Sequence, residues 1–340
     1  MNKITKSLLL VCALFLCGQA YAEPLSARTD LQSMAARGEQ FDVAMPVVRV
    51  SGFDREAEFV AHQKADLTNK NFNMSNVTTF NDVRITSIGN EKEFSLAVYA
   101  NGEKVSFDDN RLMARAIMER KSLGEPISVE QAVNKADAYL NNTIKPMLRL
   151  GQNELIEPYQ VLKAIYGEGD QERFEESITA YFVIYTRKIN GIHVIGAGSK
   201  IRVMVGVDGT ILGYRYDWPK VDEVMPAVTV SQNEFERRKE KICNNGNLSC
   251  KDLKVVDRFE CGIYDPGSLH RYGHDVNVLQ PACMVSLKAD KSSAEAFMMF
   301  IPLSRSEDIV VDSKWFETEM LVNDKKIHEL LPKYEGKILE

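Results

Sequence analysis

The segment from residue 178 to residue 216 constrains the fold most strongly, because apolar and polar residues alternate there between tight-turn dipeptides. Every second residue from 201 to 207 is Ile or Val, and Asn190-Gly191 and Asp208-Gly209 interrupt the pattern. Strict alternation is typical of a strand with one buried face, and Asn-Gly or Asp-Gly favours a hairpin turn. The segment therefore predicts three antiparallel strands that bury at least one face of a sheet.

Two further strand regions are predicted on the same grounds. Phe94, Leu96 and Val98 alternate before Asn101-Gly102, which indicates a hairpin within residues 83–107. Residues 155–166 fit either a short helix or a strand, and residues 167–177 are predicted to be a solvated acidic loop.

Helices are predicted where a capping residue precedes an apolar stripe. Asn110 is placed to cap a helix over residues 111–121, and Ser128 with Gln131 forms the capping-box pattern before a helix that ends near Leu140. Ser231 repeats the same device, which hints at repeated helix-plus-sheet units.

The first 22 residues have the three parts of a secretory signal. Lys3 and Lys6 precede the apolar run Ser7–Cys17, and Ala20-Tyr21-Ala22 supplies small residues for cleavage after Ala22. The run is shorter than the roughly 20 apolar residues that span a bilayer, and no later stretch approaches that length. We therefore expect a periplasmic or secreted protein whose mature form has no membrane span.

Length and charge limit the remaining possibilities. The chain has 340 residues and a net charge of −6, so it carries no electrostatic footprint for binding nucleic acid. The length suggests two or more domains. The predicted divisions are a signal peptide at 1–22, an N-terminal α+β region at 23–125, a helix-plus-sheet module at 126–220 and a C-terminal α+β domain at 221–340.

The cysteines left after cleavage all lie in the predicted C-terminal domain. Four cysteines allow three connectivities, and an exported chain with an even number favours disulfides. We expect Cys243–Cys250, across a turn-rich loop, and Cys261–Cys283. A zinc site is the alternative, with His270 and His274 as the candidate metal ligands, although no pair of cysteines has the usual short spacing.

No residue pattern identifies a catalytic residue or a cofactor. The run Gly196-Ala197-Gly198-Ser199-Lys200 differs in order from a phosphate-binding loop, and its glycines are better explained by a turn or bulge that needs positive φ. His193 is interpreted as structural, and His62 and His328 each stand alone in the sequence. We therefore predict no catalytic, cofactor or metal residues beyond the two candidate histidines.

One part of the chain resembles a known family. The run Asn190-Gly191-Ile192-His193-Val194-Ile195-Gly196, the alternating valines after it and Asp208-Gly209 resemble the propeptide modules of thermolysin-type and fungalysin-type proteases and the related PepSY repeats. The resemblance covers about residues 128–218. It implies a helix laid across an antiparallel sheet and a non-catalytic role toward a partner, and no protease motif H-E-x-x-H follows it here.

These observations define the expected fold and function. The fold class is predicted to be α+β, with helices packed on antiparallel sheets, two or more PepSY-like units and a disulfide-stapled C-terminal part. The expected function is a non-enzymatic exported binding module, such as a protease inhibitor or a chaperone, whose partner is another exported protein. A hydrolase with an unrecognised site and a structural cell-envelope protein are the alternatives. The sequence leaves the oligomeric state open.

Overall fold

The structure is a computed structural model, and it describes twelve parts of the chain. These are residues 45–66, 76–80, 83–90, 94–99, 102–119, 123–169, 174–226, 229–245, 255–268, 271, 277–288 and 297–304. The expected signal segment, with the cleavage position after Ala22, lies outside the described residues.

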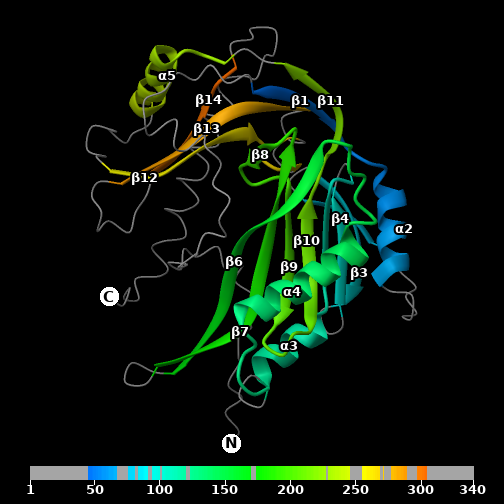
Figure 1. Cartoon of the computed structure of the whole chain (residues 1–340). Coiled ribbons are helices and arrows are strands. Elements are labelled where there is room, and N and C mark those ends of the chain that lie inside the picture. The colour runs from blue at the N-terminus through cyan, green and yellow to red at the C-terminus, as the bar shows by residue number, and fades with distance from the viewer. Residues whose placement is uncertain are drawn as a thin grey trace, which may run out of the picture.

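One mixed sheet of fourteen strands dominates the part of the chain that the structure describes. Twelve strands follow each other in the order β11-β1-β13-β12-β8-β7-β9-β10-β5-β4-β3-β2, while β14 pairs with β13 and β6 pairs with β7. Figure 1 shows β1, β11, β12, β13 and β14 running across the top of β7, β9 and β10. The strands are β1 (Pro46–Ser51), β2 (Asn76–Phe80), β3 (Val83–Asn90), β4 (Phe94–Tyr99), β5 (Lys104–Asp108), β6 (Glu154–Gly169), β7 (Phe174–Ile189), β8 (Ile192–Ile195), β9 (Lys200–Gly206), β10 (Ile211–Asp217), β11 (Lys220–Pro226), β12 (Val255–Tyr264), β13 (Val278–Lys288) and β14 (Phe297–Pro302).

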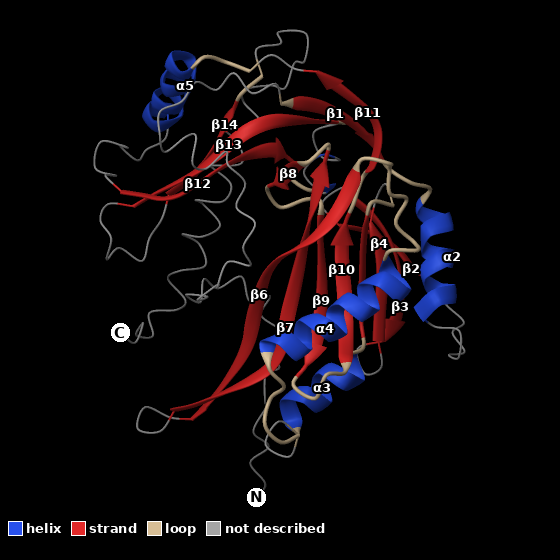
Figure 2. Cartoon of the chain, in the orientation of Figure 1, coloured by secondary structure: helices blue, strands red, loops and turns tan. Residues whose placement is uncertain are grey.

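Short helices flank the sheet (Figure 2). The described helices are α2 (Arg55–Asp66), α3 (Asn110–Met118), α4 (Val129–Tyr139) and α5 (Gln232–Asn245), and α4 continues into one wider π-helical turn, η1 (Leu140–Ile144).

The predicted fold class is wrong. We expected two or more separate units with helices packed on antiparallel sheets, and the structure instead has a single large mixed sheet. Two long-range pairings produce this result. Strand β1 lies between β11 and β13, and β8 pairs in parallel with β12. Alternation of apolar and polar residues predicts that a segment is a strand, but it does not predict which other strand pairs with it. Pairings between segments so distant in sequence could therefore not be predicted from it.

The main core lies between α4 and the face of the sheet beneath it. Ala132 and Ala136 are fully buried there against Tyr185, Val203 and Tyr214. Their small side chains let the helix approach the strands closely, and Figure 1 shows α4 crossing β7, β9 and β10. The expected capping box is confirmed, because the Gln131 amide donates to Ser128 Oγ and the Ser128 amide donates to the Gln131 side chain.

Local predictions elsewhere have mixed outcomes. The turn at Asn190-Gly191 is confirmed, with φ of 51° and 80° at the two residues. The cap of α3 is Asp109 rather than Asn110, since Asp109 Oδ1 accepts from the Leu112 amide at 3.0 Å. The expected acidic loop at 167–177 is largely strand, because β6 and β7 pair as far as Gly169 and Phe174.

Arg187 lies in a fully buried position on β7. Its Nε and Nη2 donate to Glu154 Oε2 at 3.0 and 2.5 Å, and its Nη1 donates to the Pro219 carbonyl at 2.8 Å. The guanidinium also lies 4.6 Å from the centre of the Trp218 ring. A buried cation survives in a core only when it is paired and hydrogen-bonded in this manner.

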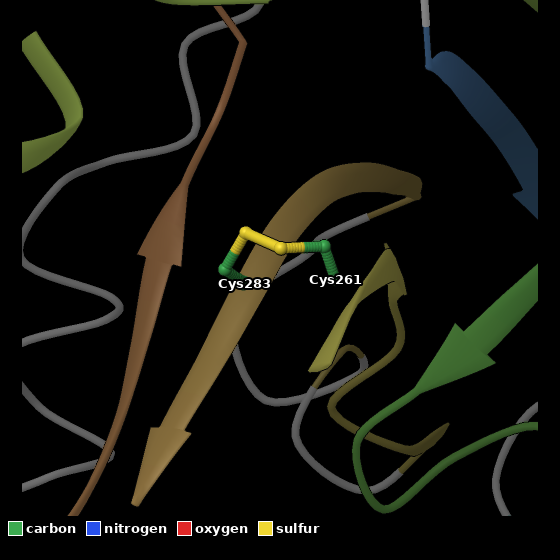
Figure 3. Close-up of a disulfide and its surroundings, with 2 residues drawn as sticks. All are labelled: Cys261 and Cys283. Carbon is green, nitrogen blue, oxygen red and sulfur yellow. A yellow bond between two sulfur atoms is a disulfide. The ribbon is translucent and has the colours of Figure 1, made fainter. Parts of the chain in front are cut away.

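A disulfide joins Cys261 on β12 to Cys283 on β13, as Figure 3 shows. The two residues are directly opposite each other in the antiparallel register. This bond is consistent with the expected Cys261–Cys283 pairing. The side chain of Cys243 and the whole of Cys250 lie outside the described residues, so the Cys243–Cys250 pairing stays a prediction.

Candidate functional site

The sheet strands under α4 have a second face, which carries most of their charge. Val203 and Val205 pack toward α4, so Arg202 and Met204 point to the opposite side. We call this side the open face. Its charged and large apolar residues, placed by strand register, are Lys104, Asp108, Leu162, Phe182, Ile184, Lys200, Arg202, Met204, Arg215 and Asp217.

Helix α3 covers one end of the open face. Ala116 of α3 is buried there against Ala180 and Leu212, with Met204 packed beside them. No helix residue appears in that cluster beyond those of α3, within the part of the chain that the structure describes. Met204 therefore lies at the end of the open face that α3 covers.

Backbone pairing places two arginines directly opposite each other on this face. Arg202 on β9 is the register partner of Arg215 on β10. Opposed like charges on neighbouring strands destabilise a sheet, so this pair costs free energy that the rest of the fold must supply. Such a cost is typical of a surface whose charges serve binding rather than stability.

The two guanidinium groups differ in their surroundings. Arg202 lies over the Phe182 ring at 5.5 Å, and burial, followed by the charge of Arg215, lowers its pKa. Arg215 is 54% exposed and donates to Asp108 Oδ2 at 3.1 Å. Among the described residues, the charge that acts on the Arg202 pKa is that of Arg215, and no carboxylate pairs with Arg202.

Two lysines extend the positive charge along the next row of the sheet. Lys200 and Lys104 are both register partners of Asp217. Lys200 Nζ donates to Thr186 Oγ1 and to the Val194 carbonyl, each at 2.8 Å. Lys104 lies 5.0 Å from the centre of the Tyr99 ring, and burial is the first cause of its lowered pKa.

Beside this row lies a buried cluster of charges, which we call the buried joint: Glu103, Asp217, Asp265 and Arg271. Arg271 is 2% exposed, and its guanidinium bonds Asp265 and Glu103 and reaches Asp217 Oδ1 at 3.3 Å. The other oxygen of Asp217 accepts from the Ser268 amide and hydroxyl, both at 2.8 Å. Hydrogen bonds from Ser268 and Arg271 therefore orient the Asp217 carboxylate toward the buried joint.

The joint holds more carboxylates than cations. Burial raises the pKa of Glu103 to about 7, against the opposing pull of Arg271. A carboxyl with such a pKa changes its charge near neutral pH, whereas an ordinary glutamate does so near 4.3.

The glycine-rich run predicted to be a turn packs against the same joint. Gly196 has φ of 97°, as expected, whereas the second positive φ of the run, 51°, belongs to Ser199 and not to Gly198. A Cβ at Gly196 would lie 2.3 Å from the Asp265 carbonyl oxygen. Ser199 is fully buried and its hydroxyl donates to Asp265 Oδ2 at 2.6 Å. The run therefore serves as a close contact between β8, β9 and the segment after β12.

The predicted histidine candidates have different outcomes. His270 and His274 lie outside the described residues, so the metal hypothesis for them stays untested. Within the described residues, no group of three or more His, Cys, Asp or Glu side chains could hold a metal ion. His193 is half-buried on β8, and burial, followed by Lys188, lowers its pKa.

His62, which stands alone in the sequence, has two partners in space. Its Nδ1 lies 2.7 Å from Tyr214 Oη and its Nε2 lies 2.6 Å from Tyr216 Oη. All three side chains are buried, so the ring ties α2 to β10 through a polar contact inside the core.

We expect His62→Phe to lower the free energy of unfolding by about 2 kcal/mol, because the phenyl ring fills the site but leaves two buried hydroxyls without this partner. Urea unfolding of the wild type and the variant measures the change. The double variant H62F/Y216F should lose less than the sum of the two single changes. Purely additive losses would contradict the hydrogen-bonded contact.

The sequence contained one signal for the open face. Arg202 and Arg215 occupy the polar positions of alternating strands, which indicates the side away from the core. Their direct opposition depends on the register of β9 and β10, with its irregularity between Ile211 and Gly213, and no sequence pattern fixed that register.

Comparisons with known proteins identify no function. No family model and no curated protein sequence matches this chain, so the resemblance to propeptide modules has no support from them. A crystal structure of an uncharacterized protein from Eubacterium rectale is similar to this chain. It shares 11% identity, covers 78% of this chain and 85% of its own, and has a TM-score of 0.38.

Proposed function

We propose that this protein is an exported binding module that contacts another exported protein through its open face. The observation that carries the proposal is the pair Arg202 and Arg215, held opposite each other by the backbone of β9 and β10. A partner that supplies negative charge would remove the repulsion between them. Relief of the repulsion between Arg202 and Arg215 would therefore add to the free energy of binding.

The mixed chemistry of the open face supports a protein as the partner. Phe182 and Leu162 are register partners on neighbouring strands, both half-buried, and they lie in the row next to Arg202. Protein interfaces combine aromatic residues and arginine in this way.

One finding is compatible with an exported protein, and a second concerns membrane spans. The Cys261–Cys283 disulfide suits an oxidising compartment. No helix in the described part of the chain is long and apolar enough to cross a membrane.

The proposal predicts that charge reversal on the open face abolishes capture of the partner. Tagged wild-type protein should recover one stoichiometric partner from the envelope or medium of the producing cells, and Arg215→Glu should recover less than a tenth as much. The new carboxylate would repel an anionic partner, and it can pair with Arg202 in the free protein. Quantitative mass spectrometry of the captured material measures the ratio.

Arg49→Glu is the matched control. Arg49 is also a strand arginine with one carboxylate partner, Glu223, and its side chain is 52% exposed, close to the 54% of Arg215. Equal loss of the partner in both variants would contradict the open-face proposal, as would full recovery by Arg215→Glu.

A further inference from the structure

The geometry points to a specific class of ligand: we propose that Arg202 and Arg215 together bind the carboxylates of an extended protein segment in which acidic and apolar residues alternate. This inference rests on the proposed function, because it names the chemistry of the partner that the open face accepts.

The first argument is the fixed geometry of the two guanidinium groups. Their strands are paired on both sides of the pair, from Lys200–Asp217 to Val203–Tyr214, so the separation of the two backbones is set by the sheet. Arg202 is also oriented by its contact with the Phe182 ring. Planar guanidinium groups held in this manner favour carboxylates or phosphates, which they bind through two parallel hydrogen bonds.

The second argument is the balance of charge around the pair. Lys104, Arg202 and Arg215 lie close enough that each arginine lowers the pKa of Lys104, and burial is the largest cause of that shift. Asp108 supplies one carboxylate to this group through Arg215. Asp217 also faces Lys104 and raises its pKa more than either arginine lowers it, while its oxygens are bonded to Ser268 and Arg271 in the buried joint. The group therefore keeps an excess of positive charge in a chain whose net charge is −6.

The third argument is the apolar surface beside the arginines, which favours a peptide over a small anion as the ligand. Phe182 is half-buried in the row next to Arg202, and its register partner Leu162 continues the apolar surface onto β6. A free phosphate would use the arginines alone. A segment with alternating acidic and apolar residues would place carboxylates on Arg202 and Arg215 and cover the neighbouring apolar side chains, since alternate residues of an extended chain share one side.

The test measures binding of a short fluorescein-labelled peptide of alternating glutamate and leucine to the purified full-length mature protein. Fluorescence anisotropy should show saturable binding. The double variant Arg202→Gln/Arg215→Gln should bind at least tenfold more weakly, while the control Arg49→Gln/Arg237→Gln, which removes the same charge elsewhere, should bind like the wild type. The same peptide with lysine in place of glutamate should not bind.

A second variant covers the case in which the double variant does not fold. Arg215→Glu changes the more exposed arginine alone and should also weaken peptide binding at least tenfold. Circular dichroism of each variant confirms that it is folded before the comparison is made.

Competition distinguishes the source of the anion. Sodium phosphate should displace the peptide no better than sodium chloride at equal ionic strength. Displacement by phosphate at much lower concentration would overturn the peptide proposal in favour of a phosphate site. Absence of peptide binding, combined with partner capture that depends on Arg215, would overturn this inference and leave the proposed function standing. Partner capture that does not depend on Arg215 would remove the proposed function itself.

Discussion

Arg271→Met is expected to lower the free energy of unfolding by about 3–5 kcal/mol, the cost of leaving buried charges without their partner. The reason is the composition of the buried joint. One guanidinium bonds Asp265 and Glu103 and reaches Asp217, and the Arg271 side chain is only 1% exposed. Methionine keeps the apolar stem of the side chain and removes the guanidinium, so the loss includes the unpaired carboxylates and the space that the guanidinium leaves. Chemical denaturation followed by tryptophan fluorescence measures the change.

Two further variants make this result specific. Arg49→Met removes the ion pair between Arg49 and Glu223, whose side chains are 52% and 54% exposed. It should lower the free energy of unfolding by less than about 1 kcal/mol. R271M/E103Q should recover part of the loss, because it removes one of the carboxylates that Arg271→Met leaves unpaired. A loss below about 1 kcal/mol for Arg271→Met would contradict the joint as a structural element.

Glu103 should make the protein less stable as pH rises from about 5 to about 7. Burial raises the pKa of Glu103 from 4.5 to about 7 in the folded protein. Between these two values the folded state keeps a proton that the unfolded state has lost, so stability falls with rising pH and levels off above pH 7. A difference of about 2.5 in pKa corresponds to at most about 3 kcal/mol. Urea unfolding at a series of pH values measures this dependence.

The charged neighbours of Glu103 define the control for this experiment. Arg271, Asp217 and Arg187 all act on its pKa, and Arg271 and Arg187 oppose the effect of burial. Glu103→Gln keeps the shape but does not titrate, so the fall in stability between pH 5 and 7 should be smaller than in the wild type by the contribution of Glu103. Glu223→Gln, at an exposed ion pair, should leave the wild-type profile unchanged. An undiminished slope in Glu103→Gln would assign the effect to another group.

Features set by neighbouring residues could be predicted from the sequence. The turn at Asn190-Gly191 needs positive φ, which Asn and Gly tolerate, and the structure has it. The capping box at Ser128 involves residues only three positions apart, and it forms as expected. The helix after Ser231 also begins where predicted, at Gln232.

Features set by distant pairing could not be predicted. The parallel contact of β8 with β12 joins residues near Val194 to residues near Ile263. It merges parts that the alternation pattern assigns to separate units, and this is why the expected fold class fails. The buried charges of Arg187 and Arg271 were also missed, because a lone arginine in a sequence is ordinarily a surface residue.

The candidate site combines both kinds of feature. The alternation of β9 predicts that Arg202 lies on the side away from the valines, and the structure places it there. Only the register of β9 with β10 reveals that Arg215 lies directly across from it. The contact of His62 with two tyrosines of β10 is of the same kind, since the residues are more than 150 positions apart.

The central claim is that the open face is the surface on which a partner protein binds, and a photo-crosslinker in place of Phe182 tests it most directly. Phe182 lies beside Arg202 on this face, and benzoylphenylalanine keeps its aromatic ring. Irradiation of producing cells should give one discrete adduct with another exported protein. The same crosslinker at Val60, which is 58% exposed on α2, should give none. An adduct at Val60 with none at Phe182 would contradict the account.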